Sequence, residues 1–191
     1  MSRGERKLRS DAAASVRVII EAAEKVLSEH PGATMEQIAK AAGVSRTTVH
    51  RHFASREFLE ERMVELAWQQ VAEAVEAARP RTAPPLVALH QATTNVLKVK
   101  ANWGFALNRS APPNQMITAL QDEVFANCDI GLRRAQEAGV IDQRIDLEWA
   151  RGVYFALITL SLQNNDNGDP DSRAATIVDT LLRGIGDRGD S

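Results

Sequence analysis

The sequence predicts an all-α fold of about nine helices, with an N-terminal three-helix domain followed by a larger helical domain. The chain of 191 residues is rich in alanine and leucine, while alternating β-branched residues are scarce. Its apolar residues recur at three- and four-residue spacing, which is the period of a helix with one buried face. Breaks rich in proline, glycine or asparagine at 79–85, 109–114 and 164–171 separate segments of helical length.

Composition favours a soluble cytoplasmic protein. The chain is 44% hydrophobic and 25% charged, with a formal net charge of -2, which is ordinary for a globular domain. The lone cysteine, Cys128, excludes an internal disulfide framework and argues against a thiolate metal site. The N-terminus is charged rather than apolar, which argues against a signal peptide. The longest apolar stretch, around 153–160, is far shorter than the ~18 residues of a membrane span.

The first elements carry clear helix signals. Apolar spacing predicts a helix over 11–28. Thr34, with Gln37 three residues later, fits a capping box that begins a second helix over 35–42. Gly43 then ends this helix, because glycine readily adopts the left-handed conformation that closes helices.

Two further serines mark the next helix starts. Ser45 is expected to cap a short helix that ends near His52, and Ser55 a long helix over 56–79. The remaining helices are expected at 86–101, 103–108, 114–138, 147–163 and 172–186.

A short helix, a tight turn and a second short helix form a helix-turn-helix candidate. Ala39 is small where the helices approach, and Gly43 permits the turn. Ile38, Val44 and Val49 supply the apolar contacts. The positions left facing outward on the second helix are Arg46, Thr47, Thr48, His50 and Arg51. Such donors and short polar groups suit base edges and phosphates.

The stretch "MEQIAKAAGVSRTTVHRHFASREFLEERM" resembles the DNA-binding signature of the TetR family of bacterial transcriptional regulators. The close resemblance, with the helix before it, covers about 45 residues, and beyond Met63 only the general plan is similar. The chain departs from the family pattern at His50, where tyrosine is usual, and at Arg56, where lysine is usual.

The resemblance implies that the 45–52 helix enters the major groove. It also implies phosphate contacts from Thr34, Ser45, His52 and the start of the 56–79 helix. Arg56 fits this expectation, because a cation in the first helical turn is unfavourable unless an anion lies there. Histidine can gain charge near neutral pH, so His50 leads us to expect an operator affinity that depends on pH.

The last two predicted helices form the expected dimerisation surface. The 147–163 helix is apolar nearly all round between 153 and 162, so it needs cover on several sides. The resemblance implies a four-helix bundle shared by two chains, which would let a homodimer read a palindromic operator. The residues expected in it are Val153, Leu157, Leu160, Ile177, Leu181 and Leu182.

The resemblance further implies a small-molecule inducer bound among the helices of 86–163. No strong charge cluster stands out there, so we expect a largely apolar ligand. Candidate contacts are His90, Trp103, Phe105, Met116, Phe125, Cys128, Tyr154 and Phe155. The expected division is a DNA-binding domain over 1–55 and a ligand-binding and dimerisation domain over 56–191, joined by the 56–79 helix.

The alternative is a helical-bundle interaction protein, or an enzyme, in which the motif does not bind DNA. His50 and His52 stand two apart, on different faces of a helix, so they do not form a metal site. Cys128 has no histidine near it in sequence, and there is no glycine-rich phosphate loop. We therefore expect no catalysis, no cofactor and no metal. We favour a ligand-responsive regulator, and the resemblance implies a repressor, because repression is usual in the family.

Overall fold

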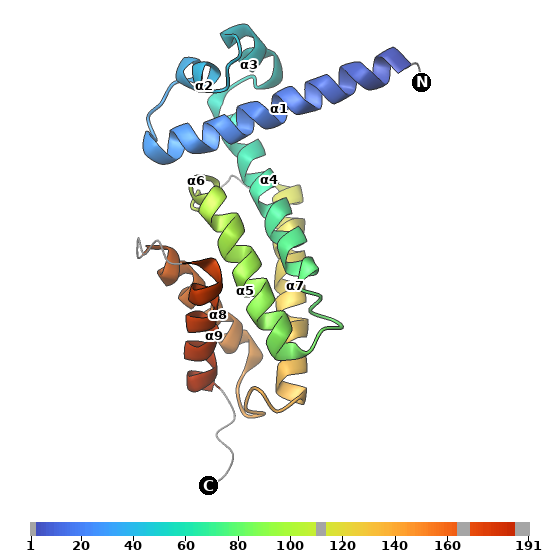
Figure 1. The fold of residues 1–191 in the computed structure, drawn as a ribbon, viewed down its shortest axis with the longest axis vertical. Coiled ribbons are helices and arrows are strands. Elements are labelled where there is room, and N and C mark those ends of the chain that lie inside the picture. The colour runs from blue at the N-terminus through green and yellow to red at the C-terminus, as the bar shows by residue number, and fades with distance from the viewer. Residues whose placement is uncertain (1–2, 110–113, 164–168, 186–191) are drawn as a thin grey trace. The chain divides into compact units, whose positions relative to one another are not determined.

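The computed structural model describes residues 3–109, 114–163 and 169–185, and these form nine α-helices (Figure 1). In chain order they are α1 (Arg3–Glu29), α2 (Met35–Ala41), α3 (Arg46–His52), α4 (Arg56–Ala77), α5 (Pro85–Asn102), α6 (Gly104–Leu107), α7 (Gln115–Glu137), α8 (Leu147–Gln163) and α9 (Pro170–Ile185). The predicted all-α class is confirmed. None of the described helices is long and apolar enough to cross a membrane.

The chain folds into two compact units. Unit 1 comprises the described residues of Met1–Ala67 and Trp103–Pro112, and unit 2 those of Trp68–Asn102 and Pro113–Ser191. This division differs from the expected one at residue 55, because the boundary falls within α4. It differs again at α6, which belongs to unit 1 although it lies in sequence between two helices of unit 2.

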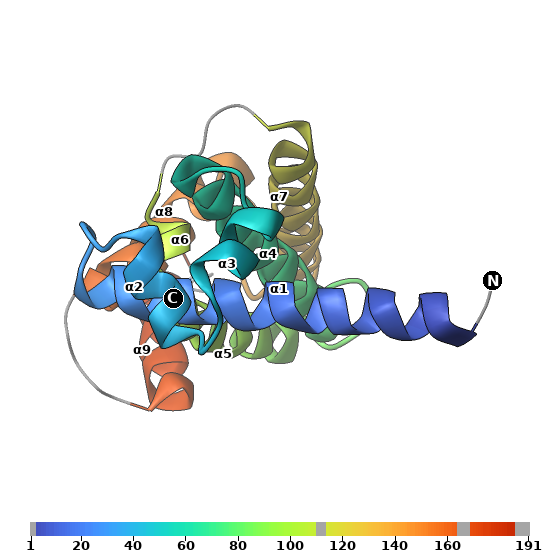
Figure 2. The same cartoon turned by 90° about the horizontal axis from the view of Figure 1, so that it is seen from above.

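Unit 1 is built on α1, which packs against α2 and α6, while α2 also packs against α3 (Figures 1 and 2). Its core is formed by large apolar side chains that are almost completely buried. They are Ile19 and Leu27 of α1, Ile38 of α2, Val49 of α3, Phe53, and Leu59 and Met63 of α4. Each helical member lies on the apolar stripe of its helix, so the three- and four-residue spacing is what places it.

Unit 2 is organised around α5, which packs against α7, α8 and α9; α8 and α9 also lie side by side (Figure 1). The loop before α5 is fastened to α7. The Arg134 guanidinium donates to the carbonyl oxygens of Pro80, at 2.7 Å, and Ala83, at 2.8 Å. These two bonds hold the end of α7 beside the start of α5.

The helix boundaries follow the expected ones within a few residues, except for α1. That helix begins at Arg3 rather than at Asp11. The residues before Asp11 include good helix formers such as glutamate, lysine and leucine, but they carry no apolar periodicity. A prediction based on a buried face therefore cannot detect this part of the helix.

Candidate DNA-binding surface and ligand cavity

The turn between α2 and α3 has the backbone geometry that the sequence predicts. Gly43 adopts a φ of +68°, in the left-handed region that favours glycine. The Val44 N–H then donates to the Ala39 carbonyl at 3.0 Å, which closes the end of α2. Ile38 and Val49 are completely buried, so α2 and α3 are fixed to each other by their apolar sides.

Side-chain caps begin both helices of the motif. The Thr34 hydroxyl accepts the Gln37 N–H at 3.3 Å, and the Thr34 N–H donates to the Gln37 side chain at 2.7 Å. The Ser45 hydroxyl accepts the Thr48 N–H at 3.0 Å and lies 2.8 Å from the Thr48 hydroxyl. Thr34 and Ser45 are both exposed, so their oxygens can also meet a group arriving from outside.

The outward face of α3 is polar and open to solvent. Arg46, Thr47, His50 and Arg51 are exposed, and Thr48 is half-buried beside the cap. The Arg46 Nε–H points to His50 Nε2 at 3.5 Å, the outer limit of a hydrogen bond. This short helix therefore presents two guanidinium groups, hydroxyls and an imidazole on one side, while its other side is buried.

His52 is less open than the other predicted DNA contacts. It is half-buried against the Phe53 ring, with 6.5 Å between the ring centroids. Its Nε2 is buried and has no hydrogen-bond partner among the described residues. Any contact of this side chain with DNA would therefore have to use the other ring nitrogen.

The side chain of Arg56 is hydrogen-bonded to partners within unit 1. Its Nε donates to the Glu60 carboxylate at 2.7 Å, while its two terminal nitrogens donate to the carbonyl oxygens of Ala33 and, at 2.5 Å, Pro31. The side chain thus ties the start of α4 to the loop before α2. The phosphate contact expected from Arg56 stays a prediction, and the guanidinium that would make it is already bound by the acid and the two carbonyls.

Two buried carboxylates extend this network towards α6. Glu60 also binds the guanidinium of Arg109, just after α6. Glu24 of α1 accepts the backbone N–H groups of Phe105, at 2.7 Å, and Ala106, at 3.1 Å, and so caps α6. Burial raises the pKa of the Glu24 carboxyl above its ordinary value, although the two N–H groups act in the opposite direction.

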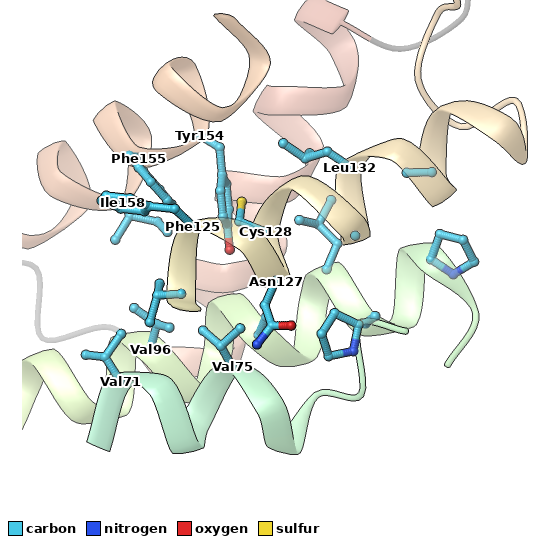
Figure 3. Close-up of a pocket in the computed structure, with 18 of the residues that line it drawn as sticks. Val71, Val75, Val96, Phe125, Asn127, Cys128, Leu132, Tyr154, Phe155 and Ile158 are labelled. Atoms are coloured by element: carbon cyan, nitrogen blue, oxygen red, sulfur yellow. The ribbon is translucent and has the colours of Figure 1, made fainter. Parts of the chain in front are cut away.

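Unit 2 contains a cavity of about 260 Å³. In Figure 3, Phe125, Tyr154 and Phe155 lie on one side of it, and Val71, Val75 and Val96 on the other. The Phe125 and Phe155 rings are 5.5 Å apart between centroids. The walls come from α4, α5, α7 and α8, and most of the groups in them are apolar.

A few polar groups interrupt these walls. The Tyr154 hydroxyl is already paired, because it lies 2.8 Å from the Thr93 hydroxyl. Asn127 donates from Nδ2 to the Glu76 carboxylate at 3.3 Å, but its buried Oδ1 has no partner among the described residues. Burial raises the pKa of the Cys128 thiol to about 12, so this group stays protonated and unreactive at neutral pH. Lys100 also lines the cavity.

Four of the predicted ligand contacts line this cavity, namely Phe125, Cys128, Tyr154 and Phe155. The other four lie outside it. Trp103 and Phe105 belong to unit 1, and Met116 is 56% exposed in the first turn of α7. His90 lies off the face of α5 that lines the cavity. The sequence reasoning missed the contributions of α4 and α5, above all Trp68 and Lys100, which sit on the cavity-facing stripes of their helices.

The six predicted dimer residues divide by exposure. Leu160 of α8 is 54% exposed, and Val153, Leu157 and Leu182 are half-buried. Ile177 and Leu181 of α9 are 5% and 1% exposed, so their own unit already covers them. Those two side chains therefore offer no surface to a second chain.

Unit 1 holds a helix-turn-helix with a buried apolar side, and unit 2 holds a largely apolar cavity. This combination is typical of ligand-sensing DNA-binding regulators. The comparisons with known proteins agree. The family described as "Bacterial regulatory proteins, tetR family" matches residues 19–63. The part of the chain that carries the helix-turn-helix is therefore similar to the DNA-binding part of the TetR family of transcriptional regulators.

Among curated relatives, the HTH-type transcriptional repressor LfrR of Mycolicibacterium smegmatis is 28% identical over 173 residues, covering 88% of this chain and 87% of the relative. The structure of LfrR in complex with proflavine is 28% identical, with a TM-score of 0.68, over 90% of this chain and 96% of that one. The regulator PfmR of Thermus thermophilus shares the fold, with a TM-score of 0.75 at 22% identity, over 88% and 99% of the two chains.

FadR of Bacillus subtilis, solved in complex with stearoyl-CoA, also shares the fold. Its TM-score is 0.71 at 22% identity, over 88% of this chain and 98% of that one.

Proposed function

We propose that this regulator is a homodimeric repressor that binds a palindromic operator through α3 and leaves it when a small molecule fills the cavity of unit 2. The observation that carries the proposal is the face of α3. Its Val49 side is completely buried, and its opposite side exposes Arg46, Thr47, His50 and Arg51. A rigidly held helix with donors on its free side suits the major groove.

A second copy is needed for useful specificity. One seven-residue helix reaches few base pairs, and a good bidentate base contact discriminates by only about 1–3 kcal/mol. Two copies related by a twofold axis can place their recognition helices about 34–36 Å apart, in successive major grooves. A palindromic site then matches the symmetry of the dimer.

The face of α8 that bears Leu160 is the proposed centre of the dimer interface. Leu160 is 54% exposed, and Val153 and Leu157 on the same helix are not fully buried. Leu182 adds a half-buried group on α9, which packs beside α8. Since Ile177 and Leu181 are covered within their own unit, this interface would use α8 more than α9.

The cavity supplies the proposed sensing site. LfrR has been solved with proflavine, and FadR with stearoyl-CoA, so proteins of this fold hold organic ligands of different chemistry. The cavity of this chain is lined mainly by apolar and aromatic groups, which suits a small molecule with a large apolar part.

The proposed coupling runs through α4. This helix supplies Leu59 and Met63 to the core of unit 1, and Trp68, Val71 and Val75 to the cavity wall. A ligand that pushes on the second half of α4 would favour a different placement of the first half. Release from DNA requires that the ligand bind the DNA-incompetent arrangement more tightly than the competent one.

Footprinting on the DNA upstream of the chain's own gene tests the proposal. We expect a protected palindrome whose half-sites are about 10 base pairs apart, or a multiple of that spacing. Light scattering on the same sample should report a dimer. A monomer, or protection without twofold symmetry, would contradict the proposal.

A further inference from the structure

We propose that the cavity of unit 2 is built for an amphipathic organic anion, with the apolar body among the aromatic walls and the carboxylate on Lys100. This inference rests on the proposed function, because it names the chemical class of the inducer. It also replaces the sequence-based expectation of a largely apolar ligand with a more specific one.

Lys100 is the single charged residue among the described residues that line the cavity. It is half-buried and forms no ion pair with any residue that the structure describes. Lys98, two positions earlier, is different: it is exposed, and its Nζ lies 3.6 Å from Asp171 Oδ2. Among the residues that the structure describes, Lys98 outside the cavity therefore has a counter-ion and Lys100 has none.

The position of Lys100 on α5 is specific. Leu89, Ala92 and Val96 line the cavity, and Lys100 continues the same stripe one turn after Val96. Figure 3 places Val96 at the same end as Val71, Phe155 and Ile158. Lys100 thus continues this wall beyond Val96, with an apolar stem that suits the neighbouring groups and the one charged group of the described lining.

Burial makes an unpaired ammonium unfavourable. Desolvation lowers the pKa of Lys100 below its ordinary value, because the surroundings disfavour the charged form. A bound carboxylate would provide the missing counter-charge. A neutral ligand would leave the ammonium unpaired, and a cationic ligand would add repulsion.

Asn127 gives an independent sign of a polar ligand. Its side chain lines the cavity and is 2% exposed, and the buried Oδ1 has no hydrogen-bond partner in the described part of the chain. The Glu76 carboxylate fixes this orientation, since it accepts from Nδ2 and would repel Oδ1. An unpaired buried acceptor is costly, and a hydroxyl or N–H of the ligand would satisfy it.

Head-group series on fixed apolar scaffolds test the proposal. Octanoate, octanol and octylamine differ in the charge of the head group, and 1-naphthylacetate, 2-(1-naphthyl)ethanol and 2-(1-naphthyl)ethylamine repeat the comparison on an aromatic body. Calorimetric titration of the full chain gives a dissociation constant for each. We expect the acid of at least one series to bind about tenfold or more tighter than its alcohol and its amine, as for a hydrogen bond to a charged group.

Variants of the chain assign the effect to a residue. Lys100→Met should lower the affinity for the acid to that for the alcohol and leave the affinity for the alcohol unchanged. Lys100→Arg should keep the preference for the acid over the alcohol. The matched control is Lys98→Met, which removes an exposed lysine of the same helix and should change nothing. Asn127→Leu should weaken only those acids that also carry a hydroxyl, such as 3-hydroxyoctanoate.

Three results would contradict the anion site. Equal or tighter binding of the amines, loss of alcohol affinity in Lys100→Met, or no binding of either series would overturn the proposal. A separate failure is recognisable: an acid that binds through Lys100 but leaves DNA affinity unchanged refutes the proposed repressor mechanism and not the anion site.

Discussion

The carboxylate of Glu24 in α1 accepts the backbone N–H of Phe105 at 2.7 Å, and so fastens α6 to unit 1. The two residues are 81 positions apart in the chain. Since α6 lies in the chain between α5 and α7, which line the cavity, α4 is not the sole covalent route between the cavity and unit 1. Glu24 is therefore expected to influence both the stability of unit 1 and its response to ligand.

Replacing Glu24 with glutamine should change how stability depends on pH. Burial raises the pKa of the Glu24 carboxyl above its ordinary value of 4.5, so the folded state holds this proton more tightly than the unfolded state does. The stabilisation that comes from this tighter proton binding is present below the pKa of the carboxyl in the unfolded state. It is lost as the pH rises through the pKa of the carboxyl in the folded state. The unfolding free energy of the wild type should therefore fall relative to Glu24→Gln as the pH rises above the ordinary pKa of 4.5.

Denaturant unfolding at several pH values measures this difference. The control is Glu21→Gln, on the same helix, where the carboxylate is exposed and pairs with Arg17 at 2.8 Å. A difference between wild type and Glu24→Gln that stays constant with pH would show that the carboxyl does not titrate as described.

Arg56 and Arg51 should separate stability from DNA contact. Arg56→Ala removes the bonds to Pro31, Ala33 and Glu60, which include a hydrogen bond to a charged group, so it should cost about 1–3 kcal/mol of stability. Arg51→Ala, on the exposed face of α3, should be nearly neutral for stability. It should instead lower the salt dependence of operator binding by about one phosphate contact.

Thermal unfolding and anisotropy of labelled operator between about 50 and 200 mM salt give the two readouts. Arg133→Ala, an exposed arginine on α7 of unit 2, is the matched control and should alter neither. The pattern would be reversed if Arg56 contacted phosphate, because its loss would then reduce the salt slope while leaving the midpoint of unfolding in place.

His50 should make operator affinity depend on pH. In the structure its Nε2 faces the Arg46 Nε–H at 3.5 Å, which requires an unprotonated nitrogen there. A proton on that nitrogen would end the contact and add a cation to the α3 face. Affinity should rise as the pH is lowered from about 8 to about 6, by the electrostatic attraction of phosphates.

The comparison is with His50→Tyr, which keeps a polar aromatic group but does not gain charge in this range. His30→Asn removes an exposed histidine away from α3 and should behave as the wild type. If the wild type and His50→Tyr lose affinity in parallel as the pH rises, the dependence arises elsewhere.

Leu160 should control the association of two chains. Leu160→Glu places a charge on a side chain that is 54% exposed and that would be buried at the centre of the proposed interface. Light scattering should then report a monomer, with operator affinity greatly reduced. Val87→Glu, at a position 57% exposed on α5, is the matched control and should remain dimeric. A dimeric Leu160→Glu would place the interface on another face.

The helix-turn-helix could be predicted well because its signals are local. Thr34, Gly43 and Ser45 act within four residues of where they stand, through caps and a left-handed turn, and the structure shows both caps and a Gly43 φ of +68°. The three- and four-residue apolar spacing likewise predicted the helices whose buried sides form the core of unit 1. The bonds of Arg56 to the carbonyls of Pro31 and Ala33 were not predicted, because these two partners lie in a distant loop that no local rule reveals.

The cavity could be predicted only in part. Large side chains on α7 and α8, such as Phe125 and Tyr154, were found because aromatic groups often line pockets. Trp103 and Phe105 were misplaced, since the attachment of α6 to unit 1 depends on the distant Glu24. Lys100 was overlooked because a lysine usually marks a solvent-facing position, and only packing reveals that this one lines a cavity.

In the proposed mechanism, ligand binding in the cavity controls the affinity of α3 for DNA. Its most direct test is the anisotropy of labelled operator bound to the full chain, titrated with the tightest acid of the head-group series. We predict release of the operator by wild type at concentrations that saturate the cavity, and release only at higher concentrations by Lys100→Met. Operator affinity that stays constant while calorimetry shows the cavity filling would contradict it.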